Sequence, residues 1–168
     1  SQSFSRRAML DAAGVTYEAR PAHVDEGAVK DALLAEGQGP RAVADALAEL
    51  KALKISQGDP AALVIGSDSV VSVGGRLFDK PVSRDNAAEH LRAFSGQTML
   101  LTSAVVLAEG GRPVWRHVGE AKLMVRELSE GFIESYLDGE WPAISGCSVR
   151  TATSARRRPN WSGSAPKL

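Results

Sequence analysis

A short apolar run over residues 62–65 most constrains the fold, because it ends in a glycine and is typical of a buried strand. Before it, Pro40 opens a segment whose apolar residues recur at the helical period, which predicts a long helix. After it, residues 70–73, the Gly74-Gly75 pair and residues 76–78 predict a hairpin. Helices and strands that follow one another in this way are typical of an α/β protein.

The other elements are expected from their end signals and periodicity. They are a helix over 6–13 capped by Ser5 and followed by Gly14, a strand over 17–22, a helix around 28–33, a helix after Ser83, strands over 100–107 and 114–128, and a last helix from Ser129. The alternation around Leu123 predicts a half-buried antiparallel strand. Too few residues precede the first helix to form the strand expected there, so the sequence is expected to be clipped at its N-terminus.

Length and composition favour one folded body, since 168 residues with 43% apolar content can bury a core. No apolar run of about 18 residues and no signal-like start occur, which predicts a cytoplasmic protein that does not span a membrane. Cys147 is the only cysteine, so neither an internal disulfide nor a zinc site is expected. The three histidines lie on different expected elements without ligand spacing, and no metal is assigned to them.

Charge divides the chain into two regions. Residues 1–147 hold 15 basic and 20 acidic side chains, whereas residues 148–168 hold five basic and no acidic ones. The second region has neither a helical nor a strand period and is not expected to fold on its own. We therefore expect a domain over 1–147 and a basic tail over 148–168.

Asp68 is the first candidate for a functional residue. It stands directly after the expected buried strand, at the carboxyl end, where open α/β sheets usually build their sites. An ordinary strand-exit turn is the alternative. Arg6 and Arg7 begin a helix, where free N–H groups favour an anion, or they form a solvated surface pair. Adjacent helical residues point about 100° apart, so only one of the two is expected to face a site.

Four further charged residues have ordinary structural explanations when they are considered alone. Lys51 and Lys80 would each be surface lysines if considered alone. Asp25 and Glu26 supply hard oxygen ligands for Mg²⁺, or an acidic first turn of a helix. Neither a P-loop nor a dinucleotide-binding glycine motif occurs in the sequence, so those two nucleotide folds lose their main support.

Taken in order, these signals resemble the Maf family of nucleoside triphosphate pyrophosphatases over roughly residues 1–147. The residues that carry the resemblance are Ser1-x-Ser3-x-x-Arg6-Arg7, Val24-Asp25-Glu26, Leu47-Ala48-x-x-Lys51-Ala52, Gly66-Ser67-Asp68, Gly75-x-Leu77-x-x-Lys80-Pro81, Ala87-x-x-x-Leu91 and Ser95-Gly96-x-Thr98.

The resemblance implies a mixed, twisted sheet flanked by helices in two lobes, with a cleft between them. It implies hydrolysis of a nucleoside triphosphate to a monophosphate and pyrophosphate with Mg²⁺ or Mn²⁺. Asp68 takes the catalytic position in it, and Glu26 and Asp68 the metal positions. The phosphate-binding positions are Ser3, Arg7, Lys51 and Lys80. Whether Asp68 acts on the attacking water or holds the metal stays open, and so does a homodimer.

The sequence departs from the family pattern in three places, which bear on whether the family's residue roles apply to it. Ser69 replaces the usual threonine or glutamine, and Met99 stands where many members have histidine. After Cys147 the Gly-rich segment and the closing strands of the family are absent, and the hypothesis is that residues 148–168 are translated out of frame or otherwise substituted.

Alternatives to an active enzyme follow from these departures. One is a catalytically inactive nucleotide-binding or regulatory protein. Nucleic-acid binding through residues 156–158 and Trp161 is a third reading, which the acidic body opposes. The preferred substrate is either thymidine or uridine triphosphate, or 7-methyl-guanosine triphosphate. The sequence slightly favours 7-methyl-guanosine triphosphate.

Overall fold

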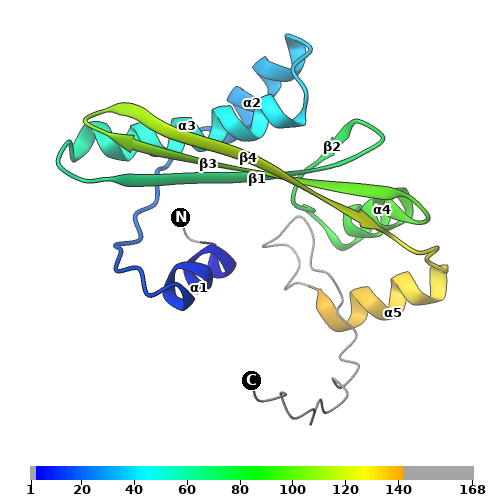
Figure 1. Cartoon of the computed structure of the whole chain (residues 1–168). Coiled ribbons are helices and arrows are strands. Elements are labelled where there is room, and N and C mark those ends of the chain that lie inside the picture. Colours follow the sequence, from blue (N-terminus) through cyan, green and yellow to red (C-terminus); the bar gives the residue numbers. More distant parts are fainter. Residues whose placement is uncertain (1–2, 142–168) are drawn as a thin grey trace, which may run out of the picture.

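The computed structural model of the chain describes residues 3–141, so the predicted boundary at residue 147 and the basic tail lie outside them. In chain order the elements are α1 (Phe4–Ala12), α2 (Glu26–Ala35), α3 (Pro40–Gly58), β1 (Val64–Val73), β2 (Arg76–Phe78), α4 (Arg84–Phe94), β3 (Thr98–Glu109), β4 (Arg112–Met124) and α5 (Glu130–Glu140) (Figure 1). In this part of the chain, none of the helices combines the length and apolar character that crossing a membrane would require.

The strands form one sheet in the order β2-β1-β3-β4. β1 is paired with β3 along the whole length of β1, whereas β2 pairs only with residues 71–73 of β1. The α/β class with flanking helices is confirmed. Every pairing between the described strands is antiparallel, where a mixed sheet was expected. Hairpins connect β1 to β2 and β3 to β4, and the β1–β3 pair is antiparallel although β2 and α4 lie between the two strands in the chain. The cleft between two lobes stays a prediction.

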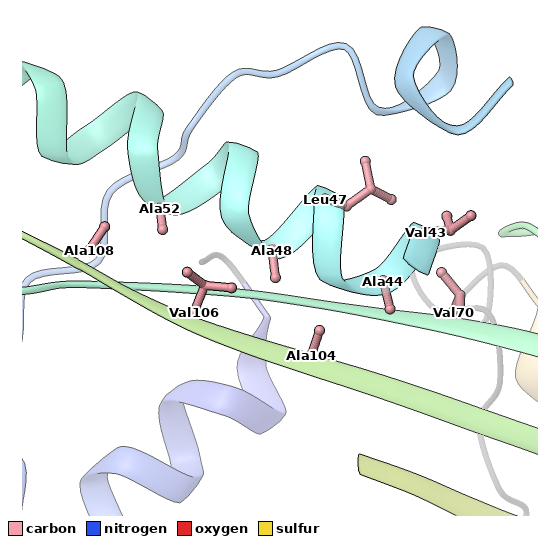
Figure 2. Packing of buried hydrophobic residues seen from close by; sticks show 9 residues of the cluster. All are labelled: Val43, Ala44, Leu47, Ala48, Ala52, Val70, Ala104, Val106 and Ala108. Atoms are coloured by element: carbon pink, nitrogen blue, oxygen red, sulfur yellow. The ribbon is translucent and has the colours of Figure 1, made fainter. Parts of the chain in front are cut away.

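α3 packs on one face of the sheet through a row of small residues. Ala44, Ala48 and Ala52 recur every fourth residue and are fully buried, and they point toward Ala104 and Val106 of β3 (Figure 2). Side chains this small let the helix backbone approach the strands closely. The approach is very close at Gly66, where an added Cβ would lie 2.2 Å from the carbonyl oxygen of Ala48.

A second cluster covers the opposite face of the sheet, where Figure 1 shows α1 and α4 beneath the strands, and a third lies between α4 and α5. Val71, Phe78, Phe94 and Met99 pack between the sheet and α4. α4 and α5 join through Ala87, Ala88, Ile133 and Leu137, and through ion pairs at their rim. The buried position of Met99 explains its apolar character.

Most helix and hairpin predictions are confirmed. Pro40 begins α3, and the hydroxyls of Ser83 and Ser129 accept hydrogen bonds from backbone N–H groups in the first turns of α4 and α5. Gly14, with φ +69°, follows the end of α1 as expected. The predicted N-cap of α1 was wrong. The N-cap residue is Ser3 and not Ser5, because the helix begins at Phe4, two residues before the expected start.

Three strand predictions need correction. Residues 17–22 form no strand, since Pro21 lacks an N–H donor and Arg20 is held instead by Glu18 and Asp59. β4 is mostly exposed rather than half-buried, because it is the outer strand of the described sheet. β1 does not end before Asp68 but continues to Val73, because the paired β3 strand holds it extended throughout.

His90 gives the fold a predictable response to pH. It lies edge-on to Phe78, with ring centroids 5.2 Å apart. Burial and the nearby charge of Arg76 lower the pKa of His90 below its ordinary 6.5, against the opposite influence of Glu89 and Asp79. The unfolded chain therefore takes up this proton more readily, so His90 costs stability as pH falls through its ordinary pKa.

We expect the free energy of unfolding of the wild type to fall more steeply than that of His90→Phe between about pH 7.5 and about pH 5.5. Urea unfolding at several pH values measures the difference. At about pH 8, where the imidazole is neutral in both states, the pH dependence of the two proteins should coincide. Equal slopes over the acidic range would contradict the assignment.

Candidate active site

Three charged side chains from three elements meet at one point. Lys51 of α3 places its Nζ 2.6 Å from Oδ1 of Asp68 on β1 and 2.8 Å from Oε1 of Glu26 on α2. The side chain of Asp68 is 12% exposed, that of Lys51 19% and that of Glu26 53%. The arrangement thus has a buried carboxylate at its base and an accessible carboxylate at its rim.

The alternation of side chains along β1 aims Asp68 at α3. Gly66, Asp68 and Val70 share the face that α3 covers, while Ser67 and Ser69 point to the other face. Lys51 precedes Ala52, whose backbone lies against Gly66. The small residues of this seam bring α3 close enough for a lysine to reach into the strand.

α2 supplies Glu26 from its first residue. The side chain of the preceding Asp25 accepts a hydrogen bond from the backbone N–H of Ala28 at 3.0 Å and so caps the helix. The sequence offered the same two interpretations for both acidic residues, whereas the structure gives each a different role. Asp25 has the ordinary capping role, and Glu26 is the one that faces Lys51.

α1 reaches β1 through Arg6, not Arg7. The Arg6 guanidinium donates to the carbonyl oxygen of Ser67 at 3.1 Å and to Oγ of Ser69 at 3.0 Å, and Ser69 also shares a hydrogen bond with Ser103. The sequence indicated that one arginine of the pair would face inward but could not choose between them. Ser69, a departure from the family pattern, is thus part of this contact.

Among residues 3–141, neither Arg7 nor Lys80 forms an ion pair with Asp68, whose ion-pair partner is Lys51. Ser3 occupies the N-cap position of α1 without a capping hydrogen bond from its side chain, and its carbonyl oxygen accepts from the backbone N–H of Arg7 at 3.1 Å. Arg7 and Lys80 both have exposed side chains. Next to Lys80, Asp79 forms an ion pair with Lys30 of α2, a residue that sequence reasoning missed because a lone helical lysine carries no signal.

Two carboxylates that already share one cation fit a hard divalent metal ion. In residues 3–141 no group of three or more His, Cys, Asp or Glu side chains could hold a metal. Mg²⁺ commonly takes only one or two protein carboxylates and completes its shell with water and substrate phosphates. Glu26 and Asp68 match that donor set, whereas a complete protein cage is not present in these residues.

The centre thus places two hard oxygen donors and one ammonium side by side on an α/β scaffold. The family model described as "Maf-like protein" matches residues 1–154. The chain belongs to the Maf family.

Curated relatives agree with this assignment. "Nucleoside triphosphate pyrophosphatase" of Sphingopyxis alaskensis is 48% identical over 145 residues, which are 86% of this chain and 73% of the relative. That of Caulobacter vibrioides is 47% identical over 86% of this chain and 72% of the relative. "7-methyl-GTP pyrophosphatase" of Rhizobium meliloti is 48% identical over 82% of this chain and 69% of the relative.

Proposed function

We propose that this chain hydrolyses a nucleoside triphosphate to a nucleoside monophosphate and pyrophosphate at the centre formed by Glu26, Lys51 and Asp68. The observation that carries the proposal is the convergence of two carboxylates on the Lys51 ammonium. The names of the curated relatives, all nucleoside triphosphate pyrophosphatases, support the reaction.

Glu26 and Asp68 would hold a divalent ion, Mg²⁺ or Mn²⁺, through their carboxylate oxygens. When bound, that ion supplies positive charge next to the triphosphate and its leaving pyrophosphate. The two carboxylates and Lys51 together carry a net charge of about −1. Without further cations, this centre would therefore repel a triphosphate.

Ser3, Arg7, Lys51 and Lys80 are proposed as donors to the phosphates. A triphosphate carries about four negative charges, and cationic donors at fixed positions stabilise both the bound substrate and the departing pyrophosphate. The exposed side chains of Arg7 and Lys80 are open to such a ligand. Arg6 holds α1 against β1 and so sets the position from which Arg7 projects.

Asp68 has two proposed roles, which are alternatives. Its carboxylate would either orient and deprotonate the water that attacks the α-phosphorus or, together with Glu26, hold the divalent ion that supplies positive charge there. In both cases the bond between the α-phosphorus and the bridging oxygen breaks, and pyrophosphate leaves with that oxygen. Its burial beneath Lys51 favours a fixed orientation of the carboxylate.

Substrate preference belongs to the same proposal. The relative named 7-methyl-GTP pyrophosphatase supports the methylated guanine nucleotide, with thymidine and uridine triphosphate as the alternative. A cytoplasmic location fits substrates drawn from the cellular nucleotide pool. A homodimer stays a prediction.

The test is pyrophosphate release from a panel of nucleoside triphosphates, including 7-methyl-GTP, dTTP and UTP, with Mg²⁺ or Mn²⁺. We expect turnover of at least one of them, abolished when the metal is chelated. An intact-mass measurement of the C-terminus should precede the assay. Tight nucleotide binding without pyrophosphate release from any triphosphate of the panel would instead favour the inactive nucleotide-binding or regulatory protein.

A further inference from the structure

Lys51 occupies the position that a cation shared by Glu26 and Asp68 must take. Its Nζ contacts one oxygen of each carboxylate, at 2.8 and 2.6 Å, and these contacts use two of its three N–H donors. We propose that the Lys51 ammonium and a divalent cation compete for this carboxylate pair. Lys51 gives up both carboxylates when the metal binds and then turns toward the phosphates. The inference rests on the proposed function.

Charge makes the two cations mutually exclusive. A divalent ion such as Mg²⁺ binds carboxylate oxygens at about 2.0–2.1 Å, closer than an ammonium does. Each of the two carboxylate oxygens would therefore have to move roughly half an ångström or more toward the cation. An ammonium left at the centre would then lie beside a doubly charged ion at contact distance, and their repulsion in a partly buried site is strong. Lys51 must therefore withdraw before the pair can close on the metal.

The elements around the centre permit this exchange. Asp68 and Lys51 belong to the tightly packed β1–α3 seam, so the base of the site is fixed. Glu26 lies at the start of α2, which packs against the core through the partly buried Val29 and Leu33, but its own side chain is 53% exposed and can change its rotamer. The long lysine side chain swings about its own bonds, and the carboxylate at the rim adjusts to the smaller ion.

Lys51 would consequently have a different partner at each stage of binding. With neither metal nor substrate present it neutralises part of the charge of the carboxylate pair and holds Glu26 near Asp68. Once the carboxylates bind the metal, the ammonium is free to donate to the triphosphate. The lysine thus delays its contact with phosphate until the hydrolytic centre is complete.

The experiment measures Mn²⁺ binding without any nucleotide, from the electron paramagnetic resonance signal of free Mn²⁺. Lys51→Met is expected to bind Mn²⁺ at least about tenfold more tightly than the wild type, because the competing cation is gone. Lys54→Met, which removes an exposed lysine from the same helix, is the matched control and should bind as the wild type does. Glu26→Gln should weaken binding.

Circular dichroism and thermal unfolding show whether each variant is folded. If Lys51→Met does not fold, Lys51→Gln replaces it, since the glutamine amide is neutral but still donates to both carboxylates. Mn²⁺ affinity in the folded variant equal to or weaker than that of the wild type, or undetectable binding in both, overturns the inference. Because no turnover is measured, this outcome is separate from failure of the proposed function, which the nucleotide panel reports.

Discussion

Asp68→Asn is expected to lower the turnover number by about 10²–10⁴-fold while leaving the protein folded. The substitution preserves the size of the side chain but removes the charge that either holds the metal or accepts the proton of the attacking water. Lys51 keeps its second partner, Glu26, at 2.8 Å, so no lone charge is left in the site. Pyrophosphate release under saturating nucleotide and metal measures the effect.

A matched control separates this effect from a general loss of negative charge. Asp31 lies on the exposed surface of α2, and Asp31→Asn should retain wild-type turnover. Thermal unfolding should show both variants folded. If the Asp68 variant keeps more than a tenth of wild-type turnover, the proposed centre is not the place of the chemistry.

Gly66→Ala is expected to destabilise the fold by about 3 kcal/mol or more. The new Cβ would lie 2.2 Å from the carbonyl oxygen of Ala48 and 2.7 Å from the backbone nitrogen of Ala52. Both atoms belong to the α3 backbone, which cannot move aside as a side chain would. Relief requires α3 to separate from β1, which would also open the alanine seam.

Gly58→Ala is the matched control, because Gly58 lies in α3, which packs against Gly66, and a Cβ added at Gly58 would meet open space. In the last turn of α3 it should be neutral or stabilise by up to about 1 kcal/mol. Urea unfolding of both variants gives the comparison. A Gly66 variant as stable as the wild type would mean that the approach of helix to strand is looser than described.

Local patterns were sufficient for most elements because their signals are short-range. Pro40, Ser83 and the Gly74-Gly75 pair act within a turn of their own position, and each begins or connects the element expected. The extent of β1 depended on pairing with β3, from Val64↔Ala108 to Val73↔Met99, and no local signal contains such a distant partner. That is why Asp68 was expected at a strand end and lies inside the strand.

The candidate site was predictable only through the ordered resemblance. Taken singly, Lys51 and Glu26 had surface explanations, and only the fold shows that both reach Asp68. The choice between Arg6 and Arg7 depended on the rotation of α1 against β1, a tertiary quantity. The roles given to Ser3, Arg7 and Lys80 stay predictions, because a ligand rather than the protein would bring them together with Asp68.

α2 joins the two lysines that the family resemblance assigns to phosphate. Glu26 in its first turn contacts Lys51, and Lys30, one turn later on the same face, contacts Asp79 beside Lys80. Because one helical turn is rigid, a displacement of Glu26 is transmitted to the segment that follows β2. If these two lysines bind the phosphates as proposed, loss of the Glu26–Lys51 contact would change the spacing between them, and binding would then depend on the length of the polyphosphate chain.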